Sequence, residues 1–346
     1  MSWKLEALLR RRLRIPHALV TSSGTHALEL ALMSLGIQAG DEVVVPSFTF
    51  VSTANAVVQI GATPVFSDIE PVNLSINPSS VKRLIGRKTK AIIAVHYAGL
   101  PAAMGELLSI ARKFRVSLIE DAAQAIGSRW EGRCLGTIGT CGILSFHETK
   151  NVTCGEGGAF LTKQPTLARR AELIREKGTN RTIFLQGRVP KYEWCSQGSN
   201  YVLSDILAAL VLPQLQRLEK IIANRRRIGL RYLEAFQSLE HQGLVRMPHP
   251  SSPEGWNWHL FFLIFPSKQE RERVQQALRD RGIEAPSHFP PLHLSPYART
   301  HFDCGRGDLP VTEQVSQAIL RLPLHSSLGD AEVKYVIHCV RQTLLK

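Results

Sequence analysis

The stretch VSLIEDAAQAIG (116–127) decides the fold of this chain. Its apolar start, Val116 to Ile119, follows a basic segment and is typical of a strand buried inside a parallel sheet. Asp121 then falls just past the carboxyl end of that strand, where open α/β sheets bind their ligands. Gln124 follows shortly after it and can hydrogen-bond such a ligand. Taken alone, Asp121 is explained equally well as an ordinary cap between a strand and a helix.

A lysine occupies a comparable place farther along the chain. CGILSFHETKN (141–151) predicts another buried strand, and GEGGAFLT (155–162) predicts a strand that returns beside it. Lys150 therefore lies at a strand end between two segments of a sheet, an unusual place for a merely solvated charge. A lysine can bond covalently to an aldehyde cofactor, and a carboxylate can keep a pyridine nitrogen protonated. Together, Lys150 and Asp121 predict a site for pyridoxal phosphate (PLP).

A candidate phosphate site precedes both residues. LVTSSGTHALELALMSLG (19–36) predicts a strand, a small polar turn and an amphipathic helix. Gly24 and Thr25 place backbone N–H groups and a hydroxyl at the positive end of the helix dipole. Ser145 offers a second hydroxyl shortly before Lys150. The segment fits neither GxxxxGK[ST] nor GxGxxG, and without the other motifs a plain capped helix explains it equally well.

The chain of 346 residues is long enough for two domains. Apolar runs alternate with helical stretches in its first part, which predicts a mixed or parallel sheet covered by helices on both faces. A long helix that begins near Ser204, interrupted or kinked at Pro213, predicts a link to a smaller α/β domain. There, WHLFFLIF (258–265) predicts a strand. We therefore expect domains at 1–203 and 204–346.

Composition argues against several classes of protein. The net charge of +13 suggests nucleic-acid binding, but the basic runs Arg10 to Arg14 and Arg225 to Arg227 lie on predicted helices, and no nucleic-acid motif accompanies them. No apolar run is long enough for a membrane span, and the N-terminus lacks the apolar core of a signal peptide. Six cysteines without CxxC spacing indicate free thiols in a reducing cytoplasm. We expect a cytoplasmic protein.

Three histidines, His288, His293 and His301, cluster loosely in a segment rich in proline. A metal site there is one interpretation, since histidine is a common metal ligand. Scattered loop histidines are the far commoner explanation. We therefore expect no metal.

The chain contains, in this order, TSSGTHAL, PSFTFVSTANAV, VHYAGLPAAM, EDAAQ, SFHETKN, GEGGAFLT and QGSNYVLSDILAAL. This series, which covers nearly the whole chain, resembles the DegT/DnrJ/EryC1/StrS family of PLP-dependent nucleotide-sugar aminotransferases. The resemblance implies an aspartate-aminotransferase-like fold (fold type I), with a mixed sheet between helices and a smaller C-terminal α/β domain. FHETKN, REKGTNR (175–181) and HFPPLH (288–293) are most similar to the TDP-4-oxo-6-deoxy-D-glucose transaminases. Those enzymes make dTDP-4-amino-4,6-dideoxy-D-galactose for surface glycans, with glutamate as amino donor.

The resemblance implies a role for each cofactor residue. Lys150 would bond to PLP and move protons during the reaction, and Asp121 would pair with the pyridine nitrogen. Gln124 would contact the ring hydroxyl, and Phe50 would stack on the ring. The phosphate would be contacted by residues of two turns, Gly24, Thr25 and Ser145.

Four further residues follow from the resemblance or from their charge. Asn200, in GSNY, matches an asparagine that reaches the phosphate from the neighbouring subunit, which implies a homodimer with shared active sites. Lys177 and Arg181 are candidates for the diphosphate of the sugar nucleotide, since a guanidinium pairs well with phosphate oxygens. Surface charges would explain these two equally well. His293, in HFPPLH, is a third candidate for contact with the substrate.

The resemblance predicts transfer of an amino group from L-glutamate to the C4 ketone of a dTDP-4-oxo-6-deoxyhexose, and two alternatives stay open. Family members usually carry a further N-terminal segment with a Gly-rich loop that helps to close the active site. A homologue truncated there could bind PLP or a sugar nucleotide without efficient turnover. The other alternative is a PLP-dependent sugar dehydratase on the same scaffold. Those relatives carry histidine at the lysine position, so Lys150 speaks against it.

Overall fold

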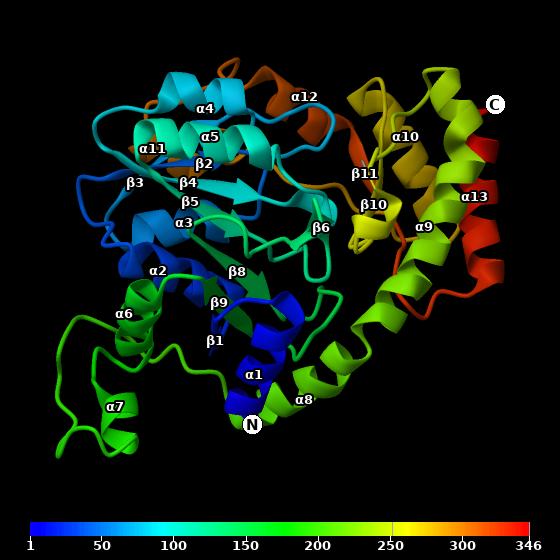
Figure 1. Ribbon diagram of the computed structural model, residues 1–346. Helices are drawn as coiled ribbons and strands as arrows, with labels where there is room; N and C mark the ends of the chain where they lie inside the picture. Colours follow the sequence, from blue (N-terminus) through cyan, green and yellow to red (C-terminus); the bar gives the residue numbers. More distant parts are fainter. Residues whose placement is uncertain (251, 346) are drawn as a thin grey trace.

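The structure is a computed structural model that describes residues 1–250 and 252–345. A seven-stranded sheet lies at its centre (Figure 1). In spatial order the strands are β1 (His17–Thr21), β9 (Gly158–Thr162), β8 (Cys141–Ser145), β5 (Ser117–Asp121), β4 (Thr89–Val95), β2 (Glu42–Pro46) and β3 (Thr63–Ser67). Neighbours pair in parallel from β8 to β3, whereas β9 is antiparallel to both β8 and β1. The mixed α/β sheet predicted from the apolar runs is confirmed.

Successive residues of the central strands enter two different hydrophobic cores. In β2, Val44 packs into one core, whereas Val43 and Val45 pack into the other. Ile92 and Ile93 of β4 divide in the same way. Because neighbouring side chains of a strand point to opposite faces, a strand that is apolar throughout must be covered on both sides.

Helices supply that cover on each face of the sheet (Figure 1). One core contains residues of α2 (Gly24–Ser34), α3 (Ser52–Gln59) and α6 (Pro165–Arg175). The other contains residues of α1 (Ser2–Leu13), α4 (Pro78–Leu84) and α5 (Met104–Phe114). Among the residues described, none of these or the other helices has both the length and the apolar character to cross a bilayer.

Strand β5 is longer at its carboxyl end than its apolar run predicts. Asp121 is the last residue of the strand, not the residue after it. The reason is the neighbouring Glu120, whose fully buried carboxylate is hydrogen-bonded by His96 at 3.0 Å and by three backbone N–H groups. Those groups belong to Gly136, Ile138 and Gly139. A charged residue can therefore continue a buried strand, because all its acceptors are occupied.

The predicted long helix is divided into α8 (Asp205–Gln216) and α9 (Leu218–His241). The break falls at Arg217, so α8 continues for three residues beyond Pro213. Helix α9 crosses to a second sheet, in which β10 (Phe261–Ile264) pairs antiparallel with β11 (Ile319–Leu322). Helices α10 (Lys268–Arg279), α12 (Pro310–Ala318) and α13 (Asp330–Leu344) share a core with it. The division after residue 203 stays a prediction.

Strand β10 is shorter than the predicted strand at 258–265. Trp258 has a left-handed backbone, with φ of 54°, which no strand accommodates. Its ring and that of Trp256 are fully buried and lie 4.0 Å apart, centroid to centroid. The burial of two indoles, rather than strand pairing, therefore determines the path of the chain before β10.

The remaining elements are short. They are α7 (Arg181–Leu185), α11 (Pro296–His301), β6 (Arg129–Trp130), β7 (Arg133–Cys134) and the 3₁₀ turns η1 (Tyr97–Gly99), η2 (Pro253–Gly255) and η3 (Leu292–Leu294).

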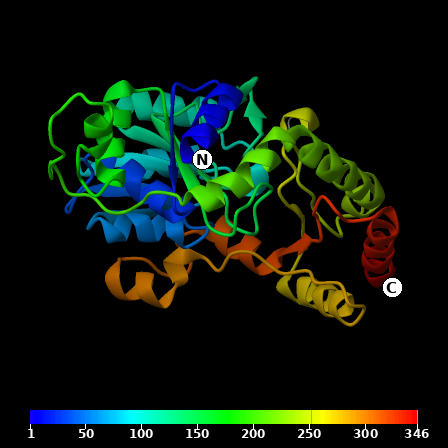
Figure 2. The ribbon, with the colours of Figure 1, turned by 90° about the horizontal axis from the view of Figure 1, so that it is seen from below.

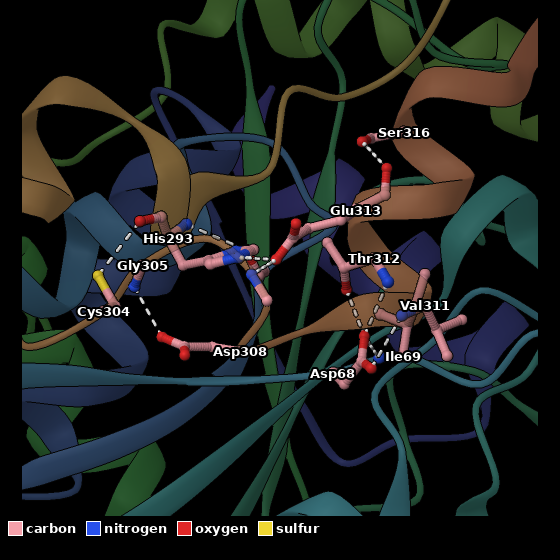
Figure 3. A network of polar contacts seen from close by, with 12 residues as sticks. Asp68, Ile69, His293, Cys304, Gly305, Asp308, Val311, Thr312, Glu313 and Ser316 are labelled. Carbon is pink, nitrogen blue, oxygen red and sulfur yellow. Dashed lines mark hydrogen bonds and ion pairs between the residues drawn. The ribbon is translucent and has the colours of Figure 1, made fainter. Parts of the chain in front are cut away.

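The segment between α10 and β11 returns to the large sheet, so that α11 lies far from α10 (Figure 2). Two hydrogen-bond clusters hold it there (Figure 3). His293 lies 2.7 Å from the Ser47 hydroxyl through Nδ1 and 3.3 Å from the Glu313 carboxylate through Nε2. The Asp68 carboxylate accepts from the N–H of Val311 at 3.1 Å and from the N–H and hydroxyl of Thr312, both at 2.8 Å. Asp68 thus caps α12 from the end of β3.

Replacing Asp68 by alanine should lower the free energy of unfolding by about 1–3 kcal/mol, because it removes this cap and leaves N–H groups without acceptors. Urea denaturation followed by circular dichroism measures the change. Asp303→Ala provides the matched control, since Asp303 is an exposed aspartate of the same segment. The control should stay within about 0.5 kcal/mol of the parent. Equal effects of the two substitutions would show that Asp68 does not hold α12 in place.

Candidate active site

A cavity of about 510 Å³ lies at the carboxyl edge of the parallel strands. Because these strands run in the same direction, the residues that follow β2, β5 and β8 meet at one edge of the sheet. The N-terminus of α2 completes this wall. The predicted cofactor residues that line the cavity are Gly24, Thr25, Phe50, Asp121, Gln124, Ser145 and Lys150.

Asp121 places a buried carboxylate at the bottom of the cavity. Its Oδ1 accepts from the N–H of Ala123 at 3.2 Å, and its Oδ2 accepts from the Thr53 hydroxyl at 3.0 Å. Burial raises the pKa of the Asp121 carboxyl, whereas these two donors and the nearby Lys150 lower it. A ligand with a protonated ring nitrogen would stabilise the charged carboxylate here.

Lys150 faces the same cavity from the loop after β8. Burial lowers the pKa of its amine, Asp121 opposes that shift, and the cation of Arg321 adds to it. A larger fraction of Lys150 is therefore neutral at physiological pH than for an exposed lysine. The neutral amine is the form that adds to an aldehyde.

The turn before α2 fits a phosphate group. The Ser23 hydroxyl accepts from the N–H of His26 at 3.0 Å and caps the eleven-residue helix, whose first N–H groups face the cavity. A Cβ added to Gly24 would lie 2.9 Å from the Cβ of Ser145, so this close approach requires glycine. The Thr25 hydroxyl lies 2.7 Å from that of Ser52. Backbone donors and hydroxyls thus converge where an anion would sit.

Two further residues match a flat cofactor ring. Phe50 is 59% exposed although it lines the cavity, so a planar ligand would cover an apolar face that is otherwise open. Gln124 is fixed through its Oε1, which accepts from the N–H of Ala98 at 2.7 Å. Its amide nitrogen remains to donate to a ligand. With Asp121, Lys150 and the phosphate cradle, these residues fit PLP.

Sequence reasoning missed part of the cavity wall. Arg321, His259, His288 and Thr53 all line it. Arg321 interrupts an apolar strand, ILRL, and His259 precedes another, so each carried a weak signal as a polar residue beside a buried run. No local pattern indicated that either strand would approach Lys150.

Four predicted residues do not line this cavity. His293 is fully buried, and its two ring nitrogens are used by Ser47 and Glu313, so we no longer count it among the substrate contacts (Figure 3). The side chains of Lys177 and Arg181 are half exposed and lie 3.7 and 3.5 Å from the Glu176 carboxylate. Asn200 is exposed near them, and its backbone pairs with that of Glu176.

The family model of the DegT/DnrJ/EryC1/StrS aminotransferases matches residues 2–341 of this chain. A DegT/DnrJ/EryC1/StrS aminotransferase from Brucella abortus is 32% identical, with a TM-score of 0.90 over 99% of this chain and 90% of that one. PseC of Helicobacter pylori, an aminotransferase of pseudaminic acid biosynthesis, is 28% identical, with a TM-score of 0.91 over 99% and 91%.

The PLP form of a protein from Streptococcus pneumoniae, named as a sugar aminotransferase, is 27% identical, with a TM-score of 0.90 over 99% of this chain and 91% of that one. The likeness to all three proteins extends over nearly the whole length of both partners. It includes the sheet, the turn before α2 and the loop of Lys150, where the cavity has the donors and the carboxylate that PLP needs. This chain therefore belongs to the DegT/DnrJ/EryC1/StrS aminotransferase family and is a PLP-dependent sugar aminotransferase.

Proposed function

We propose that this enzyme transfers the amino group of L-glutamate to the C4 ketone of a dTDP-4-oxo-6-deoxyhexose. The products would be 2-oxoglutarate and dTDP-4-amino-4,6-dideoxy-D-galactose. The observation that carries the proposal is the meeting of Lys150, Asp121 and the phosphate cradle at one cavity. The choice of sugar is supported by FHETKN and REKGTNR, which resemble the transaminases that make this product.

Three residues of the cavity have distinct parts in this reaction. When bound, PLP supplies an aldehyde that takes up the amino group and a ring that accepts electrons. Asp121 would hold the proton on the ring nitrogen, and Gln124 would donate to the ring hydroxyl. Lys150 removes the proton from the Cα of glutamate and later delivers a proton to C4 of the sugar. The side of C4 that faces Lys150 therefore sets the configuration of the product.

Arg321 supports a dicarboxylic amino donor. Its guanidinium lines both this cavity and an adjoining one of about 920 Å³, and the two cavities also share Lys150. Within residues 1–250 and 252–345, the guanidinium forms no ion pair, and its Nε is buried without a hydrogen-bond partner. A partly buried guanidinium with a buried Nε gains a partner when a carboxylate pairs with it. We assign one carboxylate of glutamate to this position.

We also propose a homodimer with shared active sites. Asn200, Lys177 and Arg181 lie outside the cavity of their own chain, which agrees with contacts to the site of a neighbouring subunit. The same segment exposes Trp194 and Leu185, at 83% and 65%. A second subunit would cover these apolar side chains.

The six free cysteines favour a reducing compartment, so we place the enzyme in the cytoplasm.

An absorbance spectrum of the PLP-loaded protein tests the proposed function directly. L-glutamate should convert the visible band of lysine-bound PLP into the near-ultraviolet band of pyridoxamine phosphate. Addition of dTDP-4-oxo-6-deoxyglucose should restore the visible band and yield an amino sugar. A visible band that does not respond to glutamate would favour the alternative, a homologue that binds PLP without efficient turnover.

Lys150→Ala should abolish the visible band, because no other amine of the described chain lines the cavity. It should also abolish transamination. Lys163→Ala is the matched control, since Lys163 is an exposed lysine remote from the cavity lining, and it should behave as the parent. Full transaminase activity in Lys150→Ala would refute the assigned role.

Arg321→Gln should raise the KM for glutamate about ten- to a hundredfold, because it removes a charge-assisted hydrogen bond to a carboxylate. The KM for the sugar nucleotide should stay nearly unchanged. Steady-state kinetics with each substrate varied in turn separates the two effects, and Arg306→Gln, at an exposed arginine, serves as control. If only the KM for the sugar nucleotide rose, Arg321 would bind the diphosphate instead.

A further inference from the structure

Two histidines of the cavity each have one ring nitrogen bound by a buried partner that determines where the proton sits. His259 lines both cavities, and His288 lines the smaller one. Lys150 lines both cavities as well. Neither histidine was assigned a role above. The partner of His259 is an amide, and the partner of His288 is a phenol.

Asn151 fixes the proton of His259 on Nδ1. The amide nitrogen of Asn151 donates to the carbonyl of Asn257 at 3.0 Å, so its Oδ1 is the atom that faces Nδ1 of His259, also at 3.0 Å. An amide oxygen only accepts, and Nδ1 must therefore carry the proton. The Nε2 of His259 is left with a lone pair, and no described residue hydrogen-bonds to it.

Tyr97 imposes the opposite arrangement on His288. The phenol is fully buried, and its only hydrogen bond in the described chain joins it to Nδ1 of His288 at 3.0 Å. A buried hydroxyl that did not donate would cost about 1–3 kcal/mol, so the phenol donates and Nδ1 accepts. The Nε2 of His288 then carries the proton. Phe289 stacks on the ring at 4.2 Å and 7° and holds its plane.

The surroundings keep both rings neutral. Burial lowers the pKa of His259 far below its usual value, and the nearby cations Lys150, Arg225 and Arg321 add to this shift. Burial likewise lowers the pKa of His288 to about 3, helped by Arg321 and Lys150. The Tyr97 phenol stays protonated, since burial raises its pKa. At neutral pH these two histidines therefore present one acceptor, Nε2 of His259, and one donor, Nε2–H of His288.

We propose that His259 and His288 act as an acceptor–donor pair that recognises a ketone with a hydroxyl on the neighbouring carbon of the sugar. His288 donates from Nε2 to the ketone oxygen, and His259 accepts the hydroxyl proton at Nε2. This step deepens the proposed function and rests on it: the substrate would be an α-hydroxy ketose nucleotide. Glutamate carries no hydroxyl, and its carboxylates require a cation such as Arg321, so the pair suits the sugar better.

The two half-reactions of the holoenzyme, followed separately by absorbance, test the assignment. His288→Phe keeps a planar ring but removes the donor, and His259→Phe removes the acceptor. Each should slow the reaction of the pyridoxamine form with dTDP-4-oxo-6-deoxyglucose roughly ten- to a hundredfold. The glutamate half-reaction should change by less than about threefold. The glutamine variants, which can still hydrogen-bond, should recover part of the loss, and His301→Gln, at an exposed histidine, should match the parent.

A sugar nucleotide without the neighbouring hydroxyl gives the sharper comparison. The parent should react more slowly with dTDP-4-oxo-3,6-dideoxyglucose than with the 3-hydroxy sugar, again roughly ten- to a hundredfold. In His259→Phe this preference should vanish, whereas His288→Phe should retain it. An undiminished preference in His259→Phe would overturn the role of the acceptor. Equal slowing of both half-reactions in His259→Phe would show that His259 acts on Lys150 and does not bind the sugar.

The roles of His259 and His288 can be tested separately from the proposed transamination. If the parent does not aminate the ketose at all, the proposed function falls. The protons can still be located by long-range ¹H–¹⁵N spectra of protein labelled at histidine. The His259 and His288 variants serve to assign the signals of the two rings. We expect Nδ1–H on His259, Nε2–H on His288, and no titration of either between about pH 6 and 8. The reverse tautomers, or a charged ring in that range, would refute the pair.

Discussion

The arrangement of this active site depends on a carboxylate that does not line the cavity. Glu120 is fully buried, and it gathers the ring of His96 and the N–H groups of Gly136, Ile138 and Gly139 around its two oxygens. Burial raises the pKa of Glu120, but these hydrogen bonds outweigh it, so that the net shift is downward. The next residue is Asp121, and side chains alternate along a strand. Anchoring Glu120 on one face of the sheet therefore aims Asp121 into the cavity on the other.

The charge of the cavity follows from what surrounds Lys150. Within the described residues, Asp121 is the buried acid of the cavity and Glu156 an exposed one, whereas Arg321 adds a second cation and the imidazoles of His259 and His288 stay uncharged. The cations of Lys150 and Arg321 can pair with a phosphorylated cofactor and an anionic amino donor. Burial, with a smaller contribution from Arg321, lowers the pKa of the Lys150 amine and so favours the neutral form that its chemistry requires.

Features encoded within one short segment were predicted well from the sequence. Asp121, Ser145 and Lys150 each follow an apolar run, and Gly24 stands at the start of an amphipathic helix, so both the mixed sheet and the position of these residues could be inferred. Arg321 and His259 could not, because their approach to Lys150 depends on how the second sheet packs. His293 shows the opposite error: its motif suggested a substrate contact, but its ring turns inward to Ser47 and Glu313.

The return of the segment between α10 and β11 to the large sheet has a mechanical consequence (Figure 2). His288 is tied to Tyr97 and His259 to Asn151, both of which belong to the first half of the chain. Arg321, in contrast, is carried by β11. A rotation of the small sheet would therefore strain these two hydrogen bonds, because β10 follows His259 closely and the Arg321 N–H donates to the carbonyl of Pro286, two residues before His288. The groups proposed to hold the two substrates of a single cavity are thus mechanically linked, and a shift of one is transmitted to the other.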